Sequence, residues 1–314
     1  MRLYQEKSAG DIEPDLGVDL AGIHFRNPVT VASGTFGSGI EYSRFVDLNK
    51  LGALTTKGVS RDPWEGNPTP RVTETPSGMM NAIGLQNPGV DVFIKRDLAF
   101  LEEFDVPVIV NVCGHSVGEY EAVVERLAED DRVAMLEINV SCPNVSCGAI
   151  QFGTDAGMLM EVTSRCKSKA GSKPVIMKLT PNVTSISDMA KAAEAGGADG
   201  VSLINTLTAM KIDIYKKRFV LANKTGGLSG PAIHPVAVRM VYEASHAIKI
   251  PVIGMGGVAS AEDALELMLA GATMVAVGMM NFTEPDITGK IIRGIKDYMV
   301  LTKTEHIRDI IGAV

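Results

Sequence analysis

Short apolar runs rich in β-branched residues recur along the chain, and each is followed by a stretch with helical periodicity. Runs such as PVIVNV and MVAVG are apolar at nearly every position, which is typical of strands covered on both faces. Helices between strands predict parallel pairing, because a parallel connection needs a crossover. The expected strands are Val29–Val31, Ala53–Thr56, Val108–Val112, Ala134–Val140, Val175–Leu179, Gly200–Ile204, Val252–Gly254 and Met274–Val277.

The segments between these strands place apolar residues on one helix face. The clearest faces are Tyr120, Val123, Val124, Leu127 and Ala128, and Ile186, Met189, Ala190 and Ala193. Ser260 and Asp263 have the spacing of a capping box before the apolar run Ala264–Ala270. The repeated strand–helix units predict an α/β protein with a (β/α)8 barrel. A doubly wound sheet has the same alternation, but its usual G-x-G-x-x-G turn is replaced here by ASGTFGSG.

The chain length agrees with one barrel of roughly 250 residues plus insertions. We expect a single domain over residues 1–314 with long inserted loops at the C-terminal face of the barrel. The long connections are 58–91, 141–155 and 206–232, and all of them leave strand ends on that face. Long ordered loops in such a place commonly act as lids or substrate walls.

Charge and composition narrow the class of function. The net charge is −7 with no basic run, which argues against nucleic acid or an anionic membrane as the main partner. No apolar stretch approaches the roughly 18 residues that span a bilayer. The N-terminal stretch MRLYQEKSAGDIEPD lacks the apolar core of a signal peptide, so a cytoplasmic protein is expected. The 4 cysteines lack the spacing of a disulfide framework, a zinc site or an iron–sulfur site, and no metal is expected.

Glycines at the ends of the last two strands predict an anion site. Gly256 and Gly257 lead into the capped helix start, and Gly278 ends the next strand. Positions without side chains let backbone N–H groups approach a phosphate, whose charge a helix N-terminus favours. Phosphate sites at this position recur in barrels. The alternative is that these glycines only form tight turns.

Polar residues at the other strand ends predict a site for a flat polar ligand. Lys57 and Lys178 lie directly at the ends of predicted strands. Each could be a fixed positive charge that binds an anion, or a surface residue whose ammonium group reaches the solvent. An asparagine offers a donor and an acceptor, which matches a ring with alternating C=O and N–H groups. Any one asparagine could equally be a turn or cap residue, but their joint placement favours a site. The asparagines are Asn81, Asn139, Asn144 and Asn205.

Cys142 lies in NVSCPNVSCG, on the loop after the fourth strand. A thiol there could be a nucleophile, a general base or an inert apolar group. No histidine close in sequence makes an obvious pair with it, which favours a proton acceptor over an acyl nucleophile. Cys147 on the same loop is interpreted as a bystander, and Cys113 and Cys166 as core or helix residues.

Taken together, these motifs resemble the dihydroorotate dehydrogenase family over residues from about 18 to 300. The motifs are NVSCPN at 139–144, NAIGLQNPG at 81–89, the strand-end Lys178, INT at 204–206, GGLSG at 226–230 and VIGMGG at 252–257. The resemblance implies a (β/α)8 barrel that holds FMN, with its phosphate at the glycine turns. It implies oxidation of dihydroorotate to orotate in pyrimidine (UMP) biosynthesis. Cys142 would remove the C5 proton while hydride leaves C6 for FMN, although Cys147 remains an alternative base.

The resemblance also implies roles for individual residues. Substrate-binding residues would be Lys57, Asn81, Gly84, Leu85, Asn139, Asn144, Asn205 and Thr206. Cofactor-binding residues would be Ala32, Ser33, Gly34, Thr56, Lys57, Asn111, Asn139, Lys178, Ile204, Gly230, Gly256, Gly257, Gly278 and Met279. Among them, Lys178 would stabilise the charge of the reduced flavin ring.

Within the family, a cysteine base, GLQNPG and FGTD at 152–155 resemble the catalytic subunit of the NAD-linked type, class 1B. That type implies a partner subunit with FAD and a [2Fe-2S] cluster, and a homodimer of this chain with two such partners. The fumarate-using type, class 1A, is the alternative within the family. Outside it, the alternatives are a flavin-free lyase or isomerase acting on a sugar phosphate, or an interaction scaffold. A scaffold would leave the concentration of polar residues at strand ends unexplained.

Overall fold

Eight parallel strands form the centre of the structure, a computed structural model that describes residues 12–141 and 152–314. The strands are β3 (Val29–Val31), β4 (Leu54–Thr55), β7 (Val108–Val112), β8 (Val133–Asn139), β9 (Val175–Lys178), β10 (Gly200–Leu203), β15 (Val252–Met255) and β16 (Met274–Val277). Their order in the sheet is β3-β16-β15-β10-β9-β8-β7-β4. All eight predicted strands are confirmed, three of them with identical bounds and the others shifted by a residue or two.

The two edge strands of this sheet meet and bring it to near closure. Gly52, just before β4, donates its backbone N–H to the Val29 carbonyl of β3 at 2.9 Å. The hydroxyls of Thr30 and Thr55 lie 3.2 Å apart inside the barrel. A Cβ on Gly52 would lie 2.0 Å from the Asn27 carbonyl oxygen, so this close approach requires glycine. The predicted (β/α)8 barrel is confirmed.

Helices follow the strands and cover the outside of the barrel. They are α1 (Val90–Val92), η3 (Phe93–Leu98) and α2 (Ala99–Leu101), which run on continuously, then α3 (Val117–Ala128), α4 (Ala156–Lys169), α5 (Ile186–Ala195), α6 (His234–Ser245), α7 (Ala261–Leu269), α8 (Met280–Thr283) and α9 (Ile287–Thr302). Short helical turns are η1 (Tyr42–Arg44), η2 (Leu48–Lys50), η4 (Pro231–Ile233) and η5 (Ile307–Asp309).

The helix starts are set by side chains that accept the first free backbone N–H groups. Ser116, Asp155 and Ser185 cap α3, α4 and α5 in this way. Ser260 caps α7 by accepting from the Asp263 N–H, as predicted. In a capping box the Asp263 carboxylate would accept a hydrogen bond from the N–H of Ser260. Here it accepts from the N–H of the preceding residue, Ala259, at 2.8 Å.

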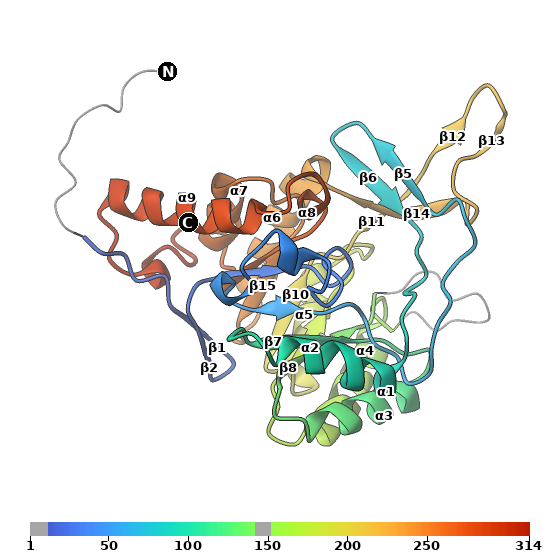
Figure 1. The fold of residues 1–314 in the computed structure, drawn as a ribbon, viewed down its shortest axis with the longest axis horizontal. Helices are drawn as coiled ribbons and strands as arrows, with labels where there is room; N and C mark the ends of the chain where they lie inside the picture. The colour runs from blue at the N-terminus through green and yellow to red at the C-terminus, as the bar shows by residue number, and fades with distance from the viewer. Residues whose placement is uncertain (1–11, 142–151) are drawn as a thin grey trace.

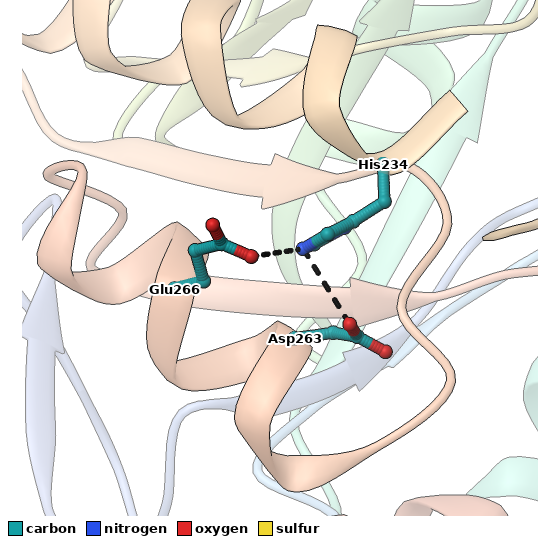
Figure 2. A group of neighbouring side chains, drawn as sticks. All are labelled: His234, Asp263 and Glu266. Carbon is teal, nitrogen blue, oxygen red and sulfur yellow. Dashed lines mark hydrogen bonds and ion pairs between the residues drawn. The ribbon is translucent and has the colours of Figure 1, made fainter. Parts of the chain in front are cut away.

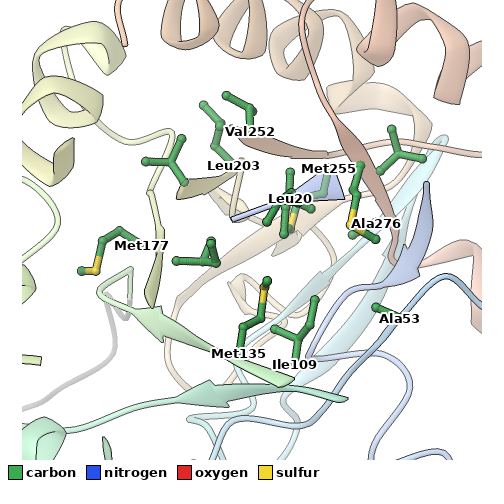
Figure 3. Packing of buried hydrophobic residues seen from close by; sticks show 14 of the residues in the cluster. Leu20, Ala53, Ile109, Met135, Met177, Leu203, Val252, Met255 and Ala276 are labelled. Atoms are coloured by element: carbon green, nitrogen blue, oxygen red, sulfur yellow. The ribbon is translucent and has the colours of Figure 1, made fainter. Parts of the chain in front are cut away.

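One large apolar cluster fills the barrel and the space between the barrel and its helices. Figure 3 shows part of it, with Ile109, Met135, Met177 and Leu203 from four of the strands. Leu20 belongs to the same cluster and comes from the N-terminal hairpin of β1 (Val18–Leu20) and β2 (Ile23–Phe25). This packing holds the strand ends, and therefore the polar residues on them, in fixed positions.

Two of the predicted long loops contain a sheet that the sequence pattern did not indicate. Its antiparallel order is β11-β14-β6-β5, with β5 (Val72–Thr75), β6 (Gly78–Asn81), β11 (Leu207–Met210) and β14 (Thr225–Ser229). β5 and β6 come from the insert after β4, and β11 and β14 from the insert after β10 (Figure 1). A further hairpin of β12 (Ile212–Asp213) and β13 (Arg218–Phe219) projects from the second insert. We call the four-stranded sheet the insert sheet.

In residues 12–141 and 152–314, no helix is both long and apolar enough to cross a membrane.

Candidate active site

A pocket lies at the C-terminal ends of the barrel strands, beside the insert sheet. The space between its walls is about 1420 Å³ when the open mouth is included. Most predicted site residues line it. They are Ala32, Ser33, Gly34, Lys57, Asn81, Gly84, Leu85, Asn139, Lys178, Ile204, Asn205, Thr206, Gly230, Gly256, Gly257, Gly278 and Met279.

The remaining predicted site residues are not part of this lining. Thr56 and Asn111 are fully buried, and Asn111 lies beneath the pocket, where its side chain bonds to Glu137. Cys142 and Asn144, together with Cys147, lie outside the residues that the structure describes. Cys113 and Cys166 are buried, as predicted.

A buried ion pair forms the base of the pocket. The Lys178 ammonium lies 3.5 Å from a carboxylate oxygen of Glu137, and the two side chains are 5% and 2% exposed. Ser202 donates to the other carboxylate oxygen at 2.6 Å, and Asn111 donates to the first at 2.5 Å. The carboxylate is thus held from three sides, which offsets part of the cost of burying it. Lys178 also reaches the hydroxyl of Ser33 at 3.4 Å. We call Asn111, Glu137, Lys178 and Ser202 the polar floor.

Three carboxamides form a directed row that begins with Asn111 in the polar floor. Because a carboxylate only accepts hydrogen bonds, Asn111 presents its NH2 group to Glu137 and its oxygen to Asn139, which donates at 3.5 Å. Asn139 in turn presents its oxygen to the NH2 group of Asn205, at 3.4 Å. The orientation of each amide therefore depends on Glu137. At the far end of the row, the Asn205 oxygen accepts from the N–H of Thr206.

The second lysine, Lys57, also lines the pocket. Lys57 follows β4, and its surroundings are mostly protein. Burial lowers the pKa of Lys57, nearby Arg71 lowers it further, and Cys113 acts in the opposite direction. Burial thus disfavours the charged form, and an anion bound beside Lys57 would favour it. The pocket therefore offers one cation compensated by Glu137 and a second that an anionic ligand would compensate.

The opposite end of the pocket is built from backbone. We call Gly256 and Gly257 the glycine turn; their φ angles are 131° and 72°, where side chains are strained. A Cβ on Gly257 would lie 2.7 Å from the His234 Cβ and 2.9 Å from the Gly230 carbonyl oxygen. The N–H groups of Gly257 and Gly278 donate to no acceptor among residues 12–141 and 152–314. Free N–H groups that line a pocket fit a phosphate.

Other glycines leave the pocket itself open. A Cβ built on Gly278 would have the Cβ of Ala32 as its nearest neighbour, at 3.8 Å, and one on Gly34 would meet nothing within 4 Å. Both residues line the pocket, so the space beside them is available to a ligand. The pocket thus combines a buried ion pair at its base, a row of carboxamides and a turn suited to a phosphate.

The insert sheet closes one side of the pocket. Asn81 is the last residue of β6, and its NH2 group points to the Gly227 carbonyl of β14 at 3.5 Å. Gly227 has no room for a side chain, because a Cβ would lie 2.0 Å from the Thr206 hydroxyl. Asn81 therefore reaches the pocket only through a pairing between two inserts distant in the sequence.

The sequence analysis did not identify three buried polar residues near the site, Glu137, Ser141 and Ser202. Glu137 lies within an apolar strand. A charged residue inside the otherwise apolar run MLEINV is the sequence feature that could have identified it. Ser141 directly precedes the undescribed segment and donates to the Lys178 carbonyl at 2.9 Å. A serine in a loop carries no comparable signal, because serine is common at turns.

Comparisons with known proteins agree in one description. The family model described as dihydroorotate dehydrogenase matches residues 15–299. A relative from Lachnoclostridium phytofermentans is 62% identical over 95% of this chain and 98% of its own length. Relatives from Alkaliphilus oremlandii and Geotalea daltonii are 56% and 54% identical, over 95% and 96% of this chain and 98% and 99% of their own lengths. All three carry the name dihydroorotate dehydrogenase B (NAD(+)), catalytic subunit.

Proposed function

The chain belongs to the dihydroorotate dehydrogenase family, and from that membership we propose how its pocket performs the reaction. The reaction is the oxidation of dihydroorotate to orotate in pyrimidine biosynthesis, with NAD+ as the acceptor reached through a partner subunit. The observation that carries the proposal is the meeting of both lysines, the carboxamide row and the glycine turn at one pocket.

Residues 1–314 act as one FMN-binding domain. The glycine turn, Gly230 and Gly278 hold the phosphate, and Ala32, Ser33 and Lys178 border the ring. Thr56 and Asn111 support this ring site from beneath, since both are fully buried. Bound FMN supplies the hydride acceptor.

The substrate is a cyclic acid with one carboxylate and a ring of alternating C=O and N–H groups, which becomes planar when it is oxidised to orotate. Lys57 pairs with the carboxylate, which restores the charge that burial of this lysine disfavours. Asn81, Asn139 and Asn205, together with Asn144 from the undescribed segment, bond to the ring. Donors held in fixed orientation can stabilise negative charge that develops on a ring carbonyl.

Cys142 acts as the base that removes the proton from C5. That proton is acidic because it lies next to a carbonyl group, and a positioned base accelerates such a transfer by about 10²–10⁴-fold. Cys142 belongs to NVSCPN, directly after Asn139 and Ser141, whose side chains reach the row of carboxamides and the Lys178 carbonyl.

The electrons leave this chain through the partner subunit. We propose that the partner carries FAD and a [2Fe-2S] cluster, because this chain has no nucleotide-binding fingerprint and no cluster-type spacing among its 4 cysteines. The assembly is a homodimer of this chain with two partner subunits. Co-purification with an iron–sulfur flavoprotein tests this arrangement. Isolated-chain activity with fumarate that equals activity with artificial acceptors would contradict the NAD linkage.

The proposed base is tested by anaerobic mixing of the FMN-loaded protein with dihydroorotate. We expect Cys142→Ala to reduce the rate of flavin bleaching at neutral pH by about 10²–10⁴-fold while FMN stays bound. Cys147→Ala is the matched control on the same loop, and it should bleach at the wild-type rate. Unchanged bleaching in Cys142→Ala, with a loss in Cys147→Ala, would transfer the role to Cys147. Purified protein that is colourless and takes up no FMN would refute the flavin-based function itself.

A further inference from the structure

His234 is the first residue of α6, and it lies buried between two groups that both accept hydrogen bonds. Its Nδ1 lies 2.9 Å from the Gly256 carbonyl oxygen of the glycine turn. Its Nε2 lies 3.1 Å from a Glu266 carboxylate oxygen and 3.7 Å from one of Asp263 (Figure 2). Both carboxylates come from α7, the helix that follows the glycine turn.

This arrangement determines the protonation of the ring. A neutral imidazole has one N–H donor and one lone pair, so it can satisfy only one of two acceptors. A carbonyl oxygen never donates, which requires a proton on Nδ1. A carboxylate oxygen also only accepts, so Glu266 at 3.1 Å from Nε2 requires a proton on Nε2. The geometry therefore fits an imidazolium, with hydrogens on both ring nitrogens.

The imidazolium connects the glycine turn to α7. A Cβ on Gly257 would lie 2.7 Å from the His234 Cβ, so the turn is packed directly on this residue. The Asp263 carboxylate is fixed in turn by the Ala259 N–H. We propose that charged His234 is a positioning residue for FMN, which holds the Gly256 carbonyl away from the pocket and keeps the N–H groups of the turn aimed into it. This inference rests on the proposed FMN site.

A positioning role that depends on charge predicts a pH dependence. The charged groups that face His234 in the described residues are Asp263 and Glu266, and the first turn of its own helix has no acidic residue. When the pH rises and Nε2 loses its proton, the lone pair faces the Glu266 carboxylate. The contact between His234 and α7 then changes from attraction to repulsion, and the turn loses its support. FMN binding should therefore weaken once His234 has lost this proton.

The test measures the Kd of FMN for the protein freed of flavin, by quenching of FMN fluorescence, at about pH 6 and about pH 8.5. We expect wild-type binding to weaken by about threefold to tenfold between them, relative to His234→Lys, which keeps a cation at both pH values. His234→Gln should bind weakly at both. His246→Lys, an exposed position just beyond the same helix, is the matched control and should follow the wild type. The FMN phosphate also titrates near pH 6, so variants are compared at the same pH.

The outcomes separate the two proposals. If wild-type protein binds no FMN at either pH, the proposed function fails. If it binds FMN but wild type and His234→Lys change in parallel, the positioning role of the charge is overturned. A rise in melting temperature with Zn²⁺ that His234→Lys abolishes would also overturn it, because His234 would then be a metal ligand. Should His234→Gln fail to fold, the comparison of wild type with His234→Lys still decides the question.

Discussion

The two ends of the pocket are built from different parts of the polypeptide. At the polar floor, side chains of Asn111, Glu137, Lys178 and Ser202 extend inward from four neighbouring strands and satisfy one another. At the glycine turn there are no side chains, and the backbone itself faces the pocket. The floor therefore depends on charge balance, whereas the turn depends on the absence of a Cβ.

This difference separates what each end can tolerate. A substitution at the floor that keeps shape but changes charge leaves a buried ion without its partner, which is costly. At the turn even a neutral methyl group is too large, because the nearest atoms lie under 3 Å from the position it would take. Removal of a charge should therefore cost most at the floor, and added side-chain volume should cost most at the turn.

The largest effect is expected at the floor. Lys178→Met removes the cation and leaves Glu137 buried with only neutral donors, so we expect unfolding free energy to fall by about 3–5 kcal/mol. Urea unfolding of the flavin-free protein measures the loss. The double variant Lys178→Met/Glu137→Gln removes both charges, and it should recover a large part of the lost stability. A double variant less stable than Lys178→Met would show that charge balance does not govern the floor.

A smaller loss of stability is expected at the turn. Gly257→Ala places a Cβ 2.7 Å from the His234 Cβ, at a φ of 72°, so we expect a loss of about 1–3 kcal/mol and much weaker FMN binding. Gly278→Ala is the matched control, because its Cβ would have the Ala32 Cβ as nearest neighbour, at 3.8 Å. It should unfold at the wild-type urea concentration. If both variants lose equal stability, the shape argument for the turn is wrong.

The smallest effect, with the opposite sign, is expected at Lys57. Burial lowers its pKa, so the folded chain binds its proton less tightly than the unfolded chain does. Lysine is therefore a cost to the ligand-free protein wherever it is charged. Lys57→Met should raise stability near pH 7 by about 0.5–1 kcal/mol. The gain should shrink as the pH approaches the ordinary lysine pKa, where the unfolded chain also loses the proton.

Orotate should bind about tenfold more weakly to the same variant. A loss of stability near pH 7 would contradict this assignment.

The barrel could be predicted from the sequence because its signals are local. Buried strands such as Met274–Val277 are apolar throughout, and the segments between strands have helical spacing with capping residues. The insert sheet could not be predicted, because the pattern of β5, VTET, is short and mostly polar. Its stability comes from pairing with distant residues, such as Gly227 with Asn81. Long-range pairing of this kind leaves no periodic signal in either segment.

The pocket residues that could be predicted are those that lie at the ends of strands. Lys178 and Asn139 are the last residues of their strands, and parallel strands bring such ends to one face. Glu137 and His234 escaped because their importance lies in partners distant in the sequence, Lys178 and Glu266. The role inferred for His234 depends on which atoms face each of its ring nitrogens. The spacing of residues along the sequence does not reveal those partners.

The insert sheet also limits how related chains can vary. Since β6 and β14 pair residue by residue, a one-residue insertion in either segment would shift their register and turn Asn81 to the opposite face. Length changes in one insert would then need a matching change in the other, although they are far apart in the gene. The tip at 214–217, between β12 and β13, is free of this coupling and can absorb additions alone. Genuine relatives should therefore differ in length at that tip far more often than within 72–81 or 225–229.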